Sequence, residues 1–210
     1  MSLKSEVYKL LAKNDREGFL TLLARDRRVV GAVNRLLFDT EELMRWRAVT
    51  AMGWVAREDP FLLEKVIARL IWTINDDSGS IGWSAPEALG EICVNDPDLV
   101  EDFFPIVISK IEKEVFRRGS LWAIARVTPV RPDLVEEAGD LVLDCLNDPD
   151  SGARGLACWC LGRMTWVEAE DDLKGLVEDQ GRFLLYEGKR LETRIVGDLA
   201  QAALEARQAD

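Results

Sequence analysis

The amino-acid sequence predicts an all-α protein in which helix pairs stack into a right-handed α–α superhelix. A proline-led apolar segment recurs at residues 60, 97 and 132, at intervals of 35 to 37 residues. A second pattern, of small residues, recurs in register with the first. The composition, 48% hydrophobic and 31% charged, is typical of a folded chain and argues against disorder. One unit of this length cannot bury its apolar face alone, so stacked neighbours are expected to share a core.

Each repeat is expected to open with a helix, here called helix A, whose first turn holds the proline. The segments read PFLLE from Pro60, PDLVE from Pro97 and PDLVE from Pro132. Proline suits this position because the first N–H groups of a helix have no partner inside it. Apolar residues then follow at helical spacing, as at Val66 and Leu70.

The second helix of each pair, helix B, is predicted from the small-residue pattern. Its anchor positions are Gly53, Gly90, Ala125, Gly162 and Gly197. The copy around Gly197 is the weakest, and it is expected to be helical like the others. The repeats should therefore form an array of about five helix pairs over residues 28–210. Two short helical patterns in residues 1–27 are expected to cap the first exposed core face, giving a single domain overall.

Acidic and basic residues recur at fixed distances before the anchors. The acids are Asp39, Asp76 and Asp148, and the bases are Arg45, Arg117, Arg154 and Lys189. With the Ala-Leu-Gly ending of helix B, these residues make the chain resemble the HEAT repeat, in particular the short HEAT-like variety named after phycobilisome lyases. The resemblance implies a solenoid of the HEAT or armadillo type, with a ladder of ion pairs between successive repeats. The ladder should be interrupted where Gly82 replaces the base and where the third repeat lacks the acid.

The composition disfavours several kinds of catalytic and metal site. The chain has no histidine, which excludes nucleophilic or general-base chemistry through that residue. Its cysteines lie in apolar segments predicted to be helical, and they form no C-x-x-C motif. They are therefore expected to be reduced, buried thiols: Cys93, Cys145, Cys158 and Cys160. A calcium-loop pattern in residues 75–87 fails because Ile81 stands where glycine is required. The sequence thus predicts no catalytic residue, no metal and no cofactor.

The charge and the start of the chain bear on location and partners. Residues 1–6 lack an apolar signal segment, and no stretch approaches the ~20 apolar residues that cross a bilayer, so a cytoplasmic location without membrane contact is expected. The net charge of −11 makes nucleic acid an unlikely partner.

The outer face of helix B is the candidate binding site. Positions seven and three before the anchor, and one after it, share this face. It carries tryptophan and arginine where bland polar residues are expected: Trp46, Trp83, Arg118, Trp122, Arg126, Trp159, Arg163, Arg190 and Arg194. Two interpretations stay open. The indoles can pack flat against neighbouring B helices while the arginines pair with Glu87 and Glu91, or the face can form a ligand groove, since large aromatics and arginine dominate binding hot spots.

The favoured hypothesis is a non-enzymatic scaffold that binds a protein or peptide, with an acidic segment suiting the arginines. The alternative is a nucleic-acid-binding protein similar to the alkylpurine DNA glycosylases that use a HEAT-like solenoid. Trp122, Arg126 and Trp159 support that alternative, whereas the net charge of −11 opposes it. A chromophore-lyase accessory role is implied by the repeat's family name alone.

Overall fold

A computed structural model describes residues 2–76 and 84–209, and these residues are mostly helical. The predicted helical-repeat fold class is confirmed. The chain divides into two compact units, residues 1–104 and 105–210. None of the helices in the described ranges is long and apolar enough to cross a membrane.

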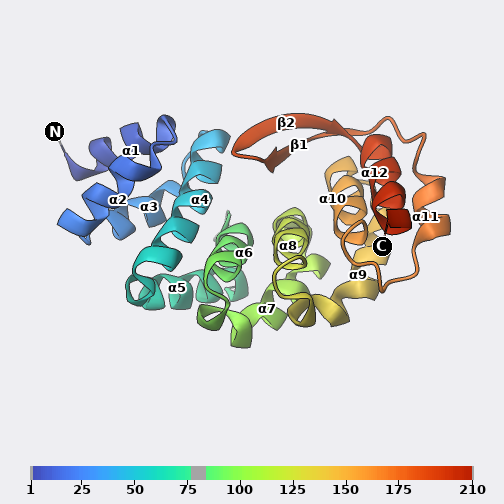
Figure 1. Cartoon of the computed structure of the whole chain (residues 1–210), viewed down its shortest axis with the longest axis horizontal. Helices are drawn as coiled ribbons and strands as arrows, with labels where there is room; N and C mark the ends of the chain where they lie inside the picture. Colours follow the sequence, from blue (N-terminus) through green and yellow to red (C-terminus); the bar gives the residue numbers. More distant parts are fainter. Residues whose placement is uncertain (1, 77–83, 210) are drawn as a thin grey trace. The chain divides into compact units, whose positions relative to one another are not determined.

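The first unit contains two helices followed by two helix pairs (Figure 1). The helices are α1 (Leu3–Ala12), α2 (Arg16–Arg25), α3 (Val29–Leu36), α4 (Glu42–Glu58), α5 (Glu64–Asn75) and α6 (Ala85–Asn95). Short 3-10 turns at Pro60–Leu62 and Pro97–Leu99 precede the A helices, each with proline in its first turn as predicted.

Packing in the first unit covers much of the predicted outer face of α4. The Phe19 ring of α2 lies 5.5 Å from the Trp54 ring of α4, and both side chains are buried. Tyr8 of α1 donates a hydrogen bond of 2.8 Å to the Glu41 carboxylate just before α4. The N-terminal helices thus contact the same helix face that the sequence assigned to a groove.

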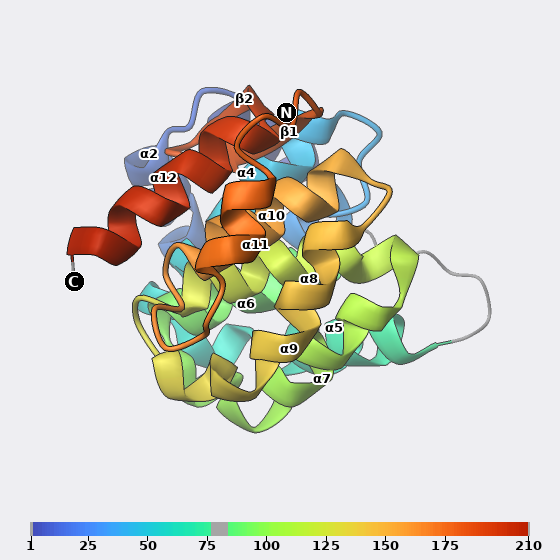
Figure 2. The same ribbon diagram turned by 90° about the vertical axis from the view of Figure 1, so that its right-hand side faces the viewer.

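The second unit continues the alternation of A and B helices. The A segments are α7 (Phe104–Ser109), which starts at the boundary between the units, then α9 (Gly139–Asp144) and α11 (Glu170–Gly175). The B helices are α8 (Glu114–Val127), α10 (Ser151–Leu161) and α12 (Val196–Ala209). Figure 2 shows α10, α11 and α12 together at one end of this unit, where α12 packs on both of the others.

The fifth repeat contradicts the expectation that its B helix would contain Arg190 and Arg194. Residues 182–195 form an antiparallel hairpin of β1 (Arg182–Glu187) and β2 (Arg190–Ile195), with Glu187 opposite Arg190. The hairpin also contradicts the expectation of a fold without any sheet. Its turn needs two residues in the left-handed region, Gly188 at φ 58° and Lys189 at φ 68°. Lys189 therefore cannot serve as the helix B base of the ladder, and α12 begins only at Val196.

The predicted charge ladder exists in the second unit, with one change of partner. Arg117 of α8 pairs with Asp148 at 2.7 Å, as the spacing implied. Arg154 of α10 pairs with Asp179 at 2.8 Å, a residue that the regular spacing had missed. Asp179 precedes the inserted hairpin, which displaces the fifth repeat from the register of the others. Gly82 lies outside the described residues.

All four cysteines are free and buried, as predicted. Burial raises the pKa of the Cys145 thiol to about 11 and that of Cys158 to about 12. These thiols therefore act as small apolar groups between helices.

Candidate functional site

The floor of the candidate site consists of two tryptophans on neighbouring B helices. Trp122 of α8 is 3% exposed and Trp159 of α10 is 7% exposed, and α8 packs directly on α10. The prediction that equivalent positions lie on adjacent stacked helices is therefore confirmed. Both indoles are buried, as the packed interpretation expected, but strand β1 contributes to the cover of Trp122. Within the described residues, the ion pairs of Arg163 and Arg194 are with Glu187 and not with Glu87 or Glu91.

The hairpin covers this floor. The Trp122 Nε1–H donates to the carbonyl of Tyr186 at 2.9 Å, and the Ser151 hydroxyl donates to the carbonyl of Arg182 at 2.9 Å. Both acceptors are main-chain groups of β1, so side chains of α8 and α10 bind this strand by its backbone. Figure 1 shows the hairpin running from α12 across α10 towards α8.

Gly155 allows the strand to lie close to α10. A Cβ atom at this position would stand 2.1 Å from Cε1 of Phe183, which is closer than any real contact. Phe183 is 6% exposed, so its ring fills the space that a side chain at residue 155 would need. The outer face of α10 is thus shaped to accept β1.

Two arginines lie over the indoles, Arg126 one turn further along α8 and Arg163 in the turn that follows α10. The Arg163 guanidinium lies 4.4 Å from the centre of the Trp159 ring, and that of Arg126 lies 5.7 Å from the Trp122 ring. The predicted pairing of each indole with an arginine four residues later is confirmed. Burial lowers the pKa of Arg163, and the nearby charge of Arg126 lowers it further. An arginine nevertheless keeps its charge at every physiological pH.

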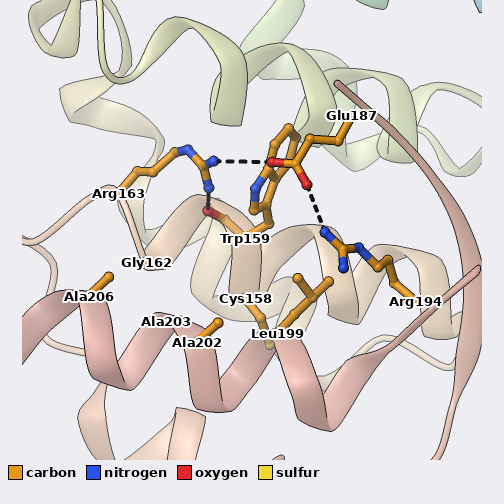
Figure 3. Close-up of a pocket in the computed structure, with 10 residues that line it drawn as sticks. All are labelled: Cys158, Trp159, Gly162, Arg163, Glu187, Arg194, Leu199, Ala202, Ala203 and Ala206. Atoms are coloured by element: carbon orange, nitrogen blue, oxygen red, sulfur yellow. Dashed lines mark hydrogen bonds and ion pairs between the residues drawn. The ribbon is translucent and has the colours of Figure 1, made fainter. Parts of the chain in front are cut away.

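A pocket of about 210 Å³ opens beside these arginines, between α10, α12 and the hairpin (Figure 3). Its walls combine apolar and charged groups. The apolar part comes from Trp159 and from α12, through Leu199 and a row of alanines at 202, 203 and 206. The charged part comes from Arg163, Glu187 and Arg194.

Within the pocket, one carboxylate stands between two guanidinium groups. Arg194 donates to Glu187 at 2.9 Å, whereas the nearest Arg163 nitrogen lies 3.8 Å from the other oxygen of Glu187. Arg163 also donates to the carbonyl of Trp159 at 2.9 Å. Figure 3 shows Glu187 between Arg163 and Arg194, beside the Trp159 ring. Such a site is suited to binding a carboxylate next to an apolar group.

The remaining predicted residues lie elsewhere. Trp46 is half-buried on α4 in the first unit. Arg118 forms an ion pair with Asp150, the N-cap residue of α10. Arg190, on β2, lies 4.0 Å from Glu192 and does not line the pocket. Trp83 lies outside the described residues.

Sequence reasoning missed the hairpin and Glu187. The signal was present in the run from Arg182 to Ile195, where aromatic residues at 183 and 186 and β-branched residues at 193 and 195 flank Gly188. The strand pattern was overlooked because the regular spacing of the helix anchors assigns this run to a helix B. Glu187 became a pocket residue only because the hairpin folds back over α10.

Comparison with known proteins agrees with this architecture. The family model of the HEAT-like repeat matches residues 114–164, which contain α8, α9 and α10. An uncharacterized protein of Archaeoglobus fulgidus is 28% identical over 116 residues. That match covers 50% of this chain and 62% of the relative, so the chain spans less than two thirds of the relative's length.

Solved structures similar to this chain include designed armadillo repeat proteins. One, in complex with the peptide (KR)4, has a TM-score of 0.58 and 18% identity, covering 97% of this chain and 90% of the designed protein. Another, computationally designed for modular peptide recognition, has a TM-score of 0.57 and 16% identity, covering 97% of this chain and 90% of that one. At these identities the likeness shows the fold. Residues 114–164 thus match the HEAT-like repeat, and the chain as a whole shares the helical-repeat fold of the designed armadillo repeat proteins.

Proposed function

We propose that this protein is a non-enzymatic binding scaffold, and that it binds an acidic segment of a protein or peptide through the second unit. The observation that carries the proposal is the pocket in which Arg163 and Arg194 converge beside the Trp159 ring. Arg126 adds a third positive charge near Arg163. The proposed site thus uses Arg126, Arg163 and Arg194 from the predicted face, with Trp122 and Trp159 as its support.

The chemistry of the pocket favours a carboxylate ligand. Guanidinium groups bind carboxylates through two parallel hydrogen bonds, and such pairs are stronger than neutral hydrogen bonds. Arg163 has one hydrogen-bond acceptor within the described part of the chain, the Trp159 carbonyl, so its other donors are available to a ligand. The alanines of α12 supply an apolar wall for the methylene groups of a glutamate side chain.

The stacking on Trp159 prepares Arg163 for binding. A long arginine side chain loses rotamer freedom when it binds, and that loss weakens the interaction. Here the ring contact at 4.4 Å and the hydrogen bond to the Trp159 carbonyl already hold the guanidinium group. A ligand therefore meets a group that is largely ordered in advance.

The test is the affinity of a short end-blocked peptide of alternating glutamate and alanine, measured by titration calorimetry. Arg163→Gln removes the stacked cation, and it should weaken binding roughly tenfold or more, the loss typical of an interface hot spot. The matched control is Lys174→Gln, which removes one positive charge from an exposed side chain of the same unit that pairs with Asp171 on its own helix. That control should bind like the wild type.

Two further measurements keep the result interpretable. Far-UV circular dichroism must show intact helices in each variant, and a lysine–alanine peptide of equal length must bind much more weakly than the glutamate peptide. Equal affinity of the Arg163→Gln and Lys174→Gln proteins for the glutamate peptide would contradict the proposed site. Absence of any binding by the wild type and by the variants would contradict the function itself.

A further inference from the structure

Glu187 stands where a bound carboxylate would stand. Its oxygens lie 2.9 Å from a nitrogen of Arg194 and 3.8 Å from a nitrogen of Arg163. It is the one acidic side chain among the residues that line this pocket. The chain therefore supplies from its own hairpin the chemical group that the arginines are suited to bind.

The contacts of Glu187 are weak enough to be exchanged. The side chains of Glu187 and Arg194 are each 41% exposed, and water screens an ion pair at such a position. The distance to Arg163 exceeds that of a hydrogen bond, so the Glu187 carboxylate binds one arginine well and the other only loosely. A second carboxylate could use donors of Arg163 that Glu187 leaves unused.

The hairpin itself does not depend on Glu187. Buried contacts hold β1 to the helices at Phe183, which packs over Gly155, and at the Tyr186 carbonyl, which accepts from Trp122. The Arg182 carbonyl is held by Ser151. The Glu187 side chain can therefore turn away from the pocket while the strand keeps its place.

We propose that Glu187 is an internal competitor, which occupies the arginine site in the free protein and is displaced by a carboxylate of the partner. This inference rests on the proposed function and adds a regulatory feature to it. The hairpin lowers the affinity for weak acidic ligands, and only a segment that also buries apolar groups against α12 displaces Glu187 efficiently. The site is thus selective for a carboxylate carried next to an apolar residue.

The experiment compares Glu187→Gln with Glu192→Gln, using the glutamate–alanine peptide as probe. Both changes remove one negative charge from the hairpin, but Glu192 lies on β2, 52% exposed, outside the pocket and 4.0 Å from Arg190. Glu187→Gln should tighten peptide binding about two- to five-fold, which corresponds to the strength of an exposed ion pair. Glu192→Gln should leave the affinity near that of the wild type.

A double variant separates competition from a general change in charge. When Arg194→Gln is already present, adding Glu187→Gln should give a clearly smaller gain, because the arginine that Glu187 binds at 2.9 Å is gone. Unchanged or weaker binding by Glu187→Gln, in a wild type that binds the peptide through Arg163, overturns the competitor and leaves the proposed function standing. Equal gains from Glu187→Gln and Glu192→Gln also overturn it. Absence of binding in every protein contradicts both proposals.

Discussion

Trp122 makes contacts of different kinds, and together they orient its indole. The Nε1–H donates to the Tyr186 carbonyl at 2.9 Å, and the Arg126 guanidinium lies 5.7 Å from the ring centre. A buried N–H group left without an acceptor would cost about 1–3 kcal/mol, so the strand carbonyl stabilises the buried ring. At this scale the tryptophans act mainly as supports, and the arginines above them carry the accessible charge.

Glu87, on α6 of the first unit, provides a residue-scale prediction for pH dependence. Its Oε2 atom is buried and has no hydrogen-bond partner among the residues that the structure describes. Burial raises the pKa of this carboxyl from 4.5 to about 7, although the backbone and the charge of Arg45 oppose the shift. The folded state therefore binds a proton more tightly than the unfolded state does. Stability should fall as the pH rises from about 4.5 to 7, by up to about 3 kcal/mol.

Urea unfolding of the wild type and of Glu87→Gln at pH 5 and pH 8 measures this effect. The glutamine side chain cannot ionise, so the variant should lose most of the decrease in stability and be the more stable protein at pH 8. Glu58→Gln, an exposed change at the end of α4, is the control and should keep the wild-type dependence. If Glu87→Gln loses as much stability between pH 5 and pH 8 as the wild type does, the pH dependence arises from another group.

At the scale of elements, strand β1 of the hairpin packs on the outer face of α10. The outer face of α10 presents Gly155 and Trp159, one helical turn apart, and Arg163 follows in the turn after the helix ends at Leu161. β1 places Phe183 over the glycine and the Glu187 carboxylate beside the arginine. The strand thus lies along the helix face that would otherwise remain open, and through Glu187 it forms part of the pocket wall.

Gly155→Ala tests this fit. The added methyl would meet the Phe183 ring at 2.1 Å, so the variant should be destabilised by about 1–3 kcal/mol through overpacking. In a Phe183→Ala background the same change should cost nothing, or stabilise the helix by up to about 1 kcal/mol, because the ring is gone and alanine favours a helix. A double-mutant cycle of chemical unfolding, followed by tryptophan fluorescence, gives the coupling.

Gly175→Ala is the matched control for this cycle. Gly175 is also helical and in the same unit, but outside its own helix backbone and chain neighbours no atom of the described residues lies within 4 Å of its added Cβ. The control should be neutral or slightly stabilising in both backgrounds. If Gly155→Ala lowers the free energy of unfolding equally with and without Phe183, the close approach of β1 to α10 is not the reason that this position holds glycine.

At the scale of the whole molecule, charge separates the proposed protein partner from nucleic acid. The chain carries a net charge of −11, while the arginines of the site form a small local group. Duplex DNA is bound mainly by neutralising its phosphates, and a few arginines on an acidic protein cannot offset the long-range repulsion. We expect binding to a DNA duplex to be weaker than about 100 μM at physiological salt, below the range of ordinary non-specific binders.

Fluorescence anisotropy with a labelled duplex measures this expectation, with the glutamate–alanine peptide as the comparison ligand. Micromolar affinity for DNA that falls steeply with added salt would favour the nucleic-acid alternative. In that case Arg163→Gln would show whether the same pocket is used.

Local patterns in the sequence were sufficient to predict the repeats. Proline at the start of helix A and small residues in helix B act within one or two helical turns, so their recurrence specified the helix pairs around Gly53, Gly90, Ala125 and Gly162. The same local reasoning predicted that Trp122 and Trp159 would lie on neighbouring helices, each with its arginine. The binding role of these residues stays a prediction.

The tertiary structure decided what covers that face. The hydrogen bond between Trp122 and Tyr186 joins residues 64 positions apart, and no helical or strand period relates them. Around Gly197 the sequence contained both a weak helix B pattern and a strand pattern, and the strands formed because the hairpin could bury Phe183 against Gly155 and Tyr186 near Trp122. The burial of the indoles, the ladder partner Asp179 and the place of Glu187 between two arginines all follow from that one packing event. Each depends on segments distant in sequence, whose energy is gained only when they meet.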